Sequence, residues 1–200
     1  MDYDVANSIN DFTSRHDWIE DLFSFIAQDS HYIFVAFLVV LFLLPARWTS
    51  VDLRRGVVAA VLAAGVGLLV AHGITLLWDR PRPFVAHPQS THLLITHARD
   101  ASFPSDHTTG AFAIAVSLLL RSRKIGLVAL AFAVLVAVAR VGVGVHYPSD
   151  VLGGALIGTA AALLVWQPPI RSRLDRLADE MGGQYERRTG RLLGSPARAG

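Results

Sequence analysis

Residues 56–78 read GVVAAVLAAGVGLLVAHGITLLW, a run without a charged side chain. About 20 apolar residues in a helix cross a bilayer, because every backbone amide pairs inside the helix. Four further apolar runs lie at 32–44 (with its flank to Trp48), 107–120, 125–145 and 151–166; the run 107–120 is short enough to be partly interfacial. The sequence therefore predicts an all-α integral membrane helical bundle with about five transmembrane helices.

Composition supports the membrane class and excludes several others. With 52% hydrophobic residues, 17% charged residues and a mean hydropathy of +0.43, the chain does not resemble a soluble, disordered or fibrous protein. It contains no cysteine, which excludes disulfide frameworks, thiolate nucleophiles and cysteine-ligated metal sites. The net charge is +2, but long uncharged runs separate the charges, so we expect the bilayer and no nucleic acid as partner.

The two ends of the chain differ from its middle. Residues 17–28 alternate apolar side chains with acids, which predicts an amphipathic helix on the membrane surface or capping the bundle. Asp2 and Asp4 stand where a cleavable signal would carry positive charge, so the first span is expected to direct insertion. We divide the chain into an acidic extracytoplasmic arm with this helix (1–30), a transmembrane domain (31–167) and a basic cytoplasmic tail, partly helical or disordered (168–200).

The distribution of basic residues predicts the orientation, since cytoplasmic loops carry the excess of lysine and arginine. One side of the bundle receives Arg47, Arg54, Arg55, Arg121, Arg123, Lys124 and the tail arginines from Arg171 to Arg198. The other side receives the acidic arm, the segment 79–105 and the connection 146–149. The C-terminus is therefore predicted in the cytoplasm and the segment 79–105 outside it.

Polar residues of uncommon kinds collect at the predicted outer face. They lie in Asp79-Arg80-Pro81-Arg82-Pro83, in Pro104-Ser105-Asp106-His107, at Arg140 and His146, and in Pro148-Ser149-Asp150. Four helix ends therefore meet there. Two of them are helix N-termini opened by a proline and a serine, where free amides and the helix dipole favour an anion.

These residue types suit phosphoryl transfer, which depends on positioned positive charge. Arg82 and Arg140 can each grip phosphate oxygens in a bidentate manner, and Ser105 adds a neutral donor. Of His107 and His146, one can attack phosphorus while the other protonates the leaving oxygen. Asp150, four residues after His146, can fix the tautomer of that imidazole and stabilise its developing charge.

Each residue taken alone has an ordinary structural explanation. Arg140 can be an arginine at a helix end whose charge reaches the interface, the histidines can be interfacial, and Asp150 or Asp106 can cap a helix. The shared location of all of them at one membrane face favours a common site.

The motifs resemble a known signature. Arg82-Pro83, Pro104-Ser105-Asp106-His107 and Arg140 followed by His146 and Asp150 are similar to the three-part signature of the type 2 phosphatidic acid phosphatase superfamily. The segments 81–87 (PRPFVAH) and 100–110 (DASFPSDHTTG) resemble the bacitracin-resistance type of undecaprenyl-diphosphate phosphatase. The resemblance covers roughly residues 56–166.

The resemblance implies an antiparallel helical bundle in a bacterial cell membrane, with the site at its extracytoplasmic end. It implies that His146 forms a phosphohistidine intermediate with Asp150 orienting it, and that His107 is general acid and then base. Arg82, Ser105 and Arg140 become phosphate ligands, and neither a metal nor another cofactor is implied. The substrate implied is a polyprenyl diphosphate, hydrolysed to the monophosphate and phosphate so that the cell-wall carrier lipid is recycled.

The sequence departs from the superfamily pattern at two positions. Thr75 stands where the first motif usually has lysine, and Arg80 is a candidate substitute, with Thr75 contributing only a hydroxyl. Asp106 stands where the signature has glycine, and a carboxylate near phosphate repels it unless it is protonated, faces away or pairs with arginine. Both departures also belong to the bacitracin-resistance type, as far as the resemblance goes.

Several alternatives remain open at this point. Phosphatidic acid or phosphatidylglycerophosphate is the alternative substrate, and loop residues His87, His92, His97 and Ser102 can hold a second phosphate. A transporter or proton relay also places such residues in a membrane, although the predicted spans contain no carboxylate at mid-bilayer. Two histidines and an aspartate can also ligate zinc in a hydrolase. The oligomeric state is left open.

Overall fold

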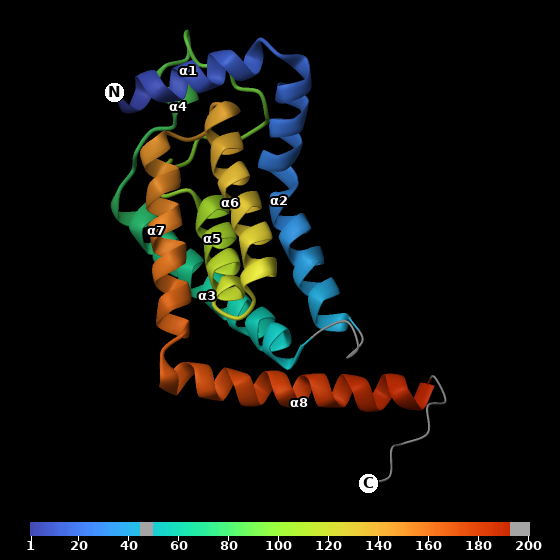
Figure 1. Ribbon diagram of the computed structural model, residues 1–200. Helices are drawn as coiled ribbons and strands as arrows, with labels where there is room; N and C mark the ends of the chain where they lie inside the picture. The colour runs from blue at the N-terminus through green and yellow to red at the C-terminus, as the bar shows by residue number, and fades with distance from the viewer. Residues whose placement is uncertain (45–49, 193–200) are drawn as a thin grey trace.

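The computed structural model describes residues 1–44 and 50–192, and within these ranges all regular structure is helical (Figure 1). The helices are α1 (Asp2–Ser14), α2 (Asp17–Leu43), α3 (Val51–Leu77), α4 (Pro83–Ala86), α5 (Asp106–Leu119), α6 (Arg123–Gly142), α7 (Pro148–Val165) and α8 (Pro168–Leu192). The predicted all-α fold is confirmed.

Four helices of the described chain, α2, α3, α6 and α7, are long and apolar enough to span a membrane. Their outer surfaces are apolar: Leu69 is 74% exposed, Leu77 90% and Leu156 72%. A continuous coat of exposed aliphatic side chains is stable in lipid and not in water. The protein is therefore a multi-pass membrane protein.

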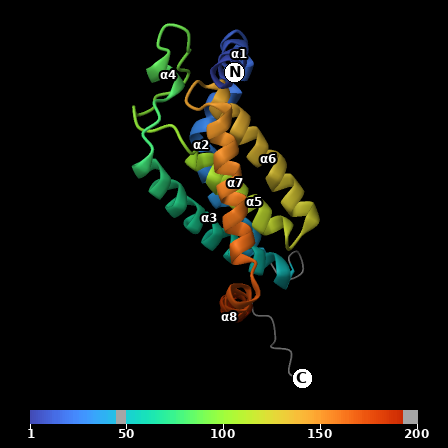
Figure 2. The same ribbon diagram turned by 90° about the vertical axis from the view of Figure 1, so that its left-hand side faces the viewer.

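The remaining predicted span, α5, has 14 residues and lies in the middle of the bundle against α3, α6 and α7 (Figure 2). Ala113, Ala115 and Leu118 are fully enclosed there. Because its neighbours cover it, α5 does not have to match the thickness of the bilayer, and its N-terminus can begin below the level of the outer loops. This recess is where the polar residues of the site lie.

Glycines set the distance between α5 and α7. A Cβ atom on Gly158 would lie 2.2 Å from the carbonyl oxygen of Thr109, and one on Gly154 would lie 2.6 Å from that of Ser105. Small residues one helical turn apart let two membrane helices approach until their backbones touch. The α5–α7 contact therefore fixes the first turn of α5 against the first turns of α7.

The structure corrects the position of the N-terminal amphipathic helix. Residues 17–28 are not a separate surface helix, because α2 runs without a break from Asp17 to Leu43 and nothing between Gln28 and Tyr32 interrupts it. The helix that lies across the end of the bundle is α1, which contacts α2, α6 and α7 (Figure 1). The proposed boundary between residues 30 and 31 therefore falls inside α2.

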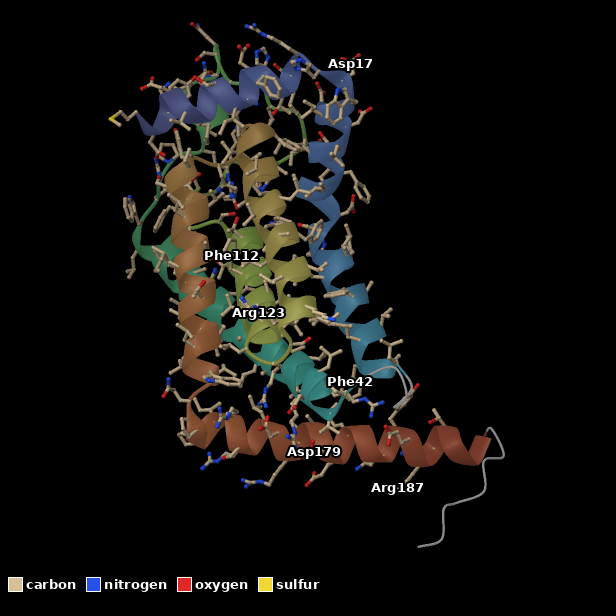
Figure 3. The ribbon with its side chains drawn as sticks, viewed as in Figure 1. Asp17, Phe42, Phe112, Arg123, Asp179 and Arg187 are labelled. Atoms are coloured by element: carbon tan, nitrogen blue, oxygen red, sulfur yellow. The ribbon has the colours of Figure 1, made fainter. Side chains whose placement is uncertain are left out.

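At the opposite end, α8 lies crosswise beneath the bundle and packs on α3 (Figure 1). Figure 3 labels Asp179 and Arg187 on this helix and Asp17 at the other end, where α2 begins. Ion pairs attach α8 to the bundle: Arg54 to Glu186 (2.6 Å), Arg55 to Asp179 (2.8 Å), and Arg121 to Asp175. The tail is therefore helical through Leu192, while Arg47, Trp48 and Arg198 lie outside the described residues.

Candidate active site

A polar cavity of about 160 Å³ lies at the α1 end of the bundle. It is lined by Thr75, Arg82, His97, Asp100, Ala101, Pro104, Asp106, His107, Arg140 and His146. These residues come from α3, α5, α6 and the loops beside them. The structure therefore brings together residues from all three sequence motifs.

His146 lies between two arginines and a carboxylate. Its Nε2 atom is 3.1 Å from an amino nitrogen of Arg82 and 3.3 Å from one of Arg140, and its Nδ1 atom is 3.5 Å from Oδ2 of Asp150. Because arginine only donates hydrogen bonds, Nε2 is the acceptor and the ring proton belongs on Nδ1. Nδ1 makes no hydrogen bond within the described residues, and Oδ2 of Asp150 is the carboxylate oxygen near it. The lone pair of Nε2 therefore points to the place where the arginines would hold an anion.

The electrostatics of the cavity keep His146 neutral. Its side chain is 2% exposed, and burial together with the charges of Arg140 and Arg82 holds its pKa well below the usual value. A neutral imidazole is the form that can attack phosphorus.

Arg82 and Arg140 are both buried, with exposed fractions of 5% and 2%. Arg82 donates from Nε to Asp100 (2.9 Å) and from its amino groups to the carbonyl oxygens of Val145 (3.0 Å) and Ala101 (3.1 Å). These bonds to a loop carboxylate and to the backbone fix the direction of the guanidinium.

Arg140 connects α6 to α2 and to the loop that contains His97. It donates to the carbonyl oxygen of Ala27 (3.0 Å) and to Nε2 of His97 (2.9 Å). Of the groups that line the cavity with Arg82 and Arg140, Asp100 is the one carboxylate hydrogen-bonded to either guanidinium. Asp106 also lines the cavity but is hydrogen-bonded to neither arginine. Two buried guanidinium groups that converge on one space, only one of them paired with a carboxylate, can bind an anion there.

Asp150 is fully buried, and each of its oxygens has a donor. Oδ1 accepts from Arg80 (2.7 Å), and Oδ2 accepts from the hydroxyl of Ser102 (2.5 Å) and the backbone amide of Tyr147 (2.8 Å). The structure thus fixes this carboxylate beside Nδ1 of His146.

Arg80, expected as a phosphate ligand, does not line the cavity. Its guanidinium donates to Asp2, Asp150 and Ser149 and lies over the ring of Tyr147. The guanidinium is directed away from the cavity because the carboxylates of Asp2 and Asp150 both lie within hydrogen-bonding distance of it. Arg80 therefore contacts Asp150 and does not bring a positive charge to the cavity beside Thr75.

The N-terminus of α7 also differs from the expectation of an open anion site. The amide of Tyr147 donates to Asp150, and the amide of Ser149 donates to Asp2 (3.1 Å). Because these amides already donate to carboxylates of the chain itself, they are not free to bind an anion in the cavity.

Ser105 and Thr75 occupy supporting positions. Ser105 is buried, its amide donates to the carbonyl oxygen of Asp150 (3.1 Å), and its hydroxyl accepts from Thr108 (3.1 Å), but it does not line the cavity. Thr75 lines the cavity, while its hydroxyl donates to the carbonyl oxygens of Ala71 (3.1 Å) and Phe103 (3.3 Å). Thr75 therefore offers phosphate no charge.

His107 lies where the cavity meets lipid. Together with Asp106 it lines both the polar cavity and an apolar groove of about 380 Å³ between α2, α3 and α5, whose walls include Phe34, Leu68 and Ile114. The ring of His107 meets the ring of His31 edge-on, with centroids 5.6 Å apart. An anionic head in the cavity can therefore keep an apolar tail in the groove.

Of the loop residues considered for a second phosphate, His97 alone lines the cavity. Burial and the charges of Arg82 and Arg140 lower its pKa, which keeps its Nε2 free to accept from Arg140. Ser102 instead donates to Asp150, and His87 stacks on Tyr3 at 3.6 Å. The side chain of His92 is exposed, and its backbone amide is held by Asn10.

Sequence reasoning missed the parts played by Asp2, His31 and Asp100. His31 carries a signal that could have been used, namely an ionisable side chain next to an apolar run. Asp100 lies within the quoted motif 100–110, but only the folded loop shows that it pairs with Arg82. Nothing in the sequence places Asp2 beside the site.

Among the residues that the structure describes, no group of three or more histidine, aspartate or glutamate side chains is arranged to hold a metal ion.

The fold is a membrane helical bundle whose arginine-lined cavity lies next to an apolar groove, an arrangement that suits the head group of an anionic lipid. Residues 56–173 match the PAP2 superfamily, and the chain belongs to that family. This confirms the resemblance noted in the sequence.

Relatives and solved structures agree with this membership. The chain is 38% identical over 169 residues to undecaprenyl-diphosphatase BcrC of Bacillus subtilis, covering 84% of this chain and 83% of that protein. It is 36% identical over 171 residues to the putative undecaprenyl-diphosphatase YbjG of Escherichia coli, covering 84% and 83%. The crystal structure of Aquifex aeolicus LpxE superposes with a TM-score of 0.67 at 27% identity, covering 80% of this chain and 92% of that one.

Proposed function

We propose that this protein is a membrane lipid phosphatase that hydrolyses a polyprenyl diphosphate, undecaprenyl diphosphate first, to the monophosphate and inorganic phosphate. The observation that carries the proposal is Nε2 of His146, held between Arg82 and Arg140 in a cavity that shares Asp106 and His107 with a neighbouring apolar groove. Relatives that cover most of the chain carry the name undecaprenyl-diphosphatase.

In the first step, the lone pair on Nε2 of His146 attacks the terminal phosphorus. The bond from that phosphorus to the bridging oxygen breaks, and His107, protonated once the anionic head group offsets the charges of Arg82 and Arg140, donates a proton to the departing oxygen of the lipid monophosphate. Arg82 and Arg140 balance the negative charge on the phosphoryl oxygens, and Asp150 stabilises the positive imidazole through Nδ1–H.

In the second step, water attacks the phosphohistidine. His107, now neutral, takes a proton from that water, the bond between Nε2 and phosphorus breaks, and inorganic phosphate leaves. His146 recovers its lone pair and His107 its proton, so the enzyme returns to its starting state.

For the orientation, we propose that the cavity faces the extracytoplasmic side of a bacterial cell membrane and that the C-terminus is cytoplasmic. Arg54, Arg55, Arg121 and the arginines of α8 all lie at the end opposite the cavity. In this orientation the enzyme returns the cell-wall carrier lipid to its monophosphate form.

The test is phosphate release from undecaprenyl diphosphate by the purified protein in detergent with a chelator present, beside phosphatidic acid. We expect release from the diphosphate, none from the His146→Ala variant, and unchanged release from the matched His92→Ala variant, whose side chain is exposed. Loss of activity with chelator would favour a metal hydrolase. Faster release from phosphatidic acid would make that lipid the substrate, and no release from either by folded protein would refute the phosphatase proposal.

A further inference from the structure

Helix α1 reaches the carboxylate beside His146 through a single arginine. Oδ2 of Asp2, in the first turn of α1, lies 2.6 Å from one amino nitrogen of Arg80, and Oδ1 of Asp150 lies 2.7 Å from the other. The guanidinium carbon of Arg80 lies 4.0 Å from the ring centroid of Tyr147. Arg80 therefore bridges two carboxylates and packs on an aromatic ring.

We propose that Asp2 and Arg80 are positioning residues for phosphoryl transfer: Asp2 holds Arg80, and Arg80 holds Asp150 in the orientation and charge state that His146 needs. The inference rests on the proposed function, because it takes His146 as the nucleophile and Asp150 as its partner.

The first argument is geometric. Because Arg80 holds Oδ1 of Asp150, the other oxygen, Oδ2, is the one that faces Nδ1 of His146 at 3.5 Å. Ser102 and the amide of Tyr147 hold Oδ2 from its other sides. Removing Arg80 would leave Oδ1 as a buried charged atom without a donor, and the carboxylate would turn to find one.

The second argument concerns charge. Asp150 is fully buried and, paired with Arg80 alone, would belong to a neutral pair. Asp2 adds a second carboxylate to the same guanidinium, so the three side chains together carry one net negative charge. That charge lies next to His146, which becomes a cation when Nε2 binds phosphorus, and it therefore stabilises the phosphohistidine.

The third argument is that Asp2 is held in place. It accepts hydrogen bonds from the amide (3.1 Å) and the hydroxyl (2.5 Å) of Ser149. Farther along α1, the side-chain nitrogen Nδ2 of Asn10 donates to the backbone carbonyl oxygens of His92 and Gly142, each at 2.8 Å. The helix is thus held both at Asp2 and at Asn10. The carboxylate of Asp2 is therefore already in position to accept from Arg80.

The test begins with Asp2→Asn, which removes the charge but keeps an acceptor for Ser149. We expect kcat to fall about tenfold, the lower end of the losses found when the partner that orients a metal-binding histidine or carboxylate is removed. KM should stay unchanged because Asp2 does not line the cavity. The rate of phosphohistidine formation in a single turnover should fall by the same factor, and Asp2→Glu should recover most of it.

The matched control is Asp11→Asn, the same chemical change on the same helix, where Asp11 pairs with Arg15 at the surface (2.7 Å). It should leave kcat at the level of the unmodified protein. A double-mutant cycle with Arg80→Gln completes the design, because residues that act through one another give effects that do not add. The double variant should be about as slow as Arg80→Gln alone.

Three results would overturn the inference: unchanged kcat in Asp2→Asn, an effect confined to KM, or additive losses in the cycle. An equal loss of kcat in Asp11→Asn would also overturn the inference, because any change on α1 would then lower kcat, whether or not it touches Arg80. The unmodified protein and His146→Ala are measured in parallel. If the folded, unmodified protein releases no phosphate, the proposed function has failed, and if His146→Ala still releases it, His146 is not the nucleophile. An inactive His146→Ala beside a fully active Asp2→Asn refutes the inference alone.

Discussion

At the scale of single residues, the proposed role of His146 as nucleophile predicts where activity is lost in acid. Burial, with Arg140 and Arg82 close by, holds the pKa of His146 well below the usual 6.5, so the ring stays neutral as the pH falls through that value. Activity is lost only when the imidazole gains a proton, and the acid limb of kcat/KM, which reports the free enzyme, should therefore have its midpoint below pH 6.5.

Histidine nitrogen NMR of the protein in detergent checks the same prediction without substrate. The His146→Ala variant identifies the resonance of His146. Titration of that resonance at or above pH 6.5 would contradict the prediction.

Arg140 differs from a lysine in geometry as well as in charge. Its two amino groups donate to Ala27 and His97, and one of them also contacts His146. A lysine offers one ammonium and cannot bind two phosphate oxygens in a plane. We expect Arg140→Lys to lower kcat/KM by about 100-fold, the order found for loss of one donor to a reacting oxyanion. Arg99→Lys, at an exposed loop position, is the control; equal activities of the two variants would remove Arg140 from the phosphate site.

At the scale of helices, the backbone contact between α5 and α7 positions His107 relative to Asp150. A methyl group on Gly158 would meet the carbonyl oxygen of Thr109 at 2.2 Å, so Gly158→Ala must push the two helices apart. Because a shift of about 1 Å at reacting groups can cost about 100-fold in rate, we expect a large loss of kcat together with a lower melting temperature.

Gly73→Ala on α3 is the matched control for Gly158→Ala, since a Cβ atom there meets nothing within 4 Å. Gly73→Ala should change neither kcat nor the melting temperature. Full activity of Gly158→Ala would mean that the close α5–α7 contact is not needed to align the site.

Arg54 connects three helices at the end away from the cavity. It is 6% exposed and donates to Glu186 on α8 and to the carbonyl oxygens of Phe42 and Leu44 at the end of α2. Loss of these charge-assisted bonds should cost about 2 kcal/mol. We expect Arg54→Ala to lower the melting temperature by roughly 5 °C while the folded fraction keeps its specific activity. Arg123→Ala, exposed at the start of α6, is the control; a selective loss of kcat in Arg54→Ala would show that α8 influences the cavity.

Hydropathy predicted the helices that face lipid, because a span must satisfy its backbone in an apolar medium whatever its neighbours are. It could not predict that residues 17–28 continue into α2, since an amphipathic segment and a span can share one uninterrupted helix. The motif residues His146, Asp150, Arg82 and Arg140 could be named because their chemistry is uncommon in a membrane.

The direction of Arg80 could not be read from the sequence. It depends on Asp2, which lies 78 positions away along the chain and meets Arg80 only through the packing of α1. Ser102 is a similar case: its loop has no periodic pattern, and only the fold shows that its hydroxyl serves Asp150.

At the scale of the whole molecule, the two ends of the bundle differ in chemistry. Helix α1 lies at one end of the bundle and α8 at the other (Figure 1). The cavity, with His97 in its lining, lies at the α1 end, and the arginines of α8 lie at the opposite end. A carrier lipid must keep its tail in the bilayer while its head enters the cavity, and the groove between α2, α3 and α5 lies beside the cavity, with Asp106 and His107 in both linings. The position of the cavity therefore decides which leaflet supplies the substrate.

Because the chain has no cysteine, single cysteines can report the sidedness. Thr96 in the outer loop and Ser172 on α8 are both exposed. Since basic residues stay on the cytoplasmic side, a membrane-impermeant maleimide should label Thr96→Cys in intact spheroplasts and Ser172→Cys only after the membrane is opened. The reverse pattern would place the cavity in the cytoplasm, and the enzyme would then act on lipid in the inner leaflet. Phosphate release by both variants at the unmodified rate is the control that each remains folded, so that labelling reports topology alone.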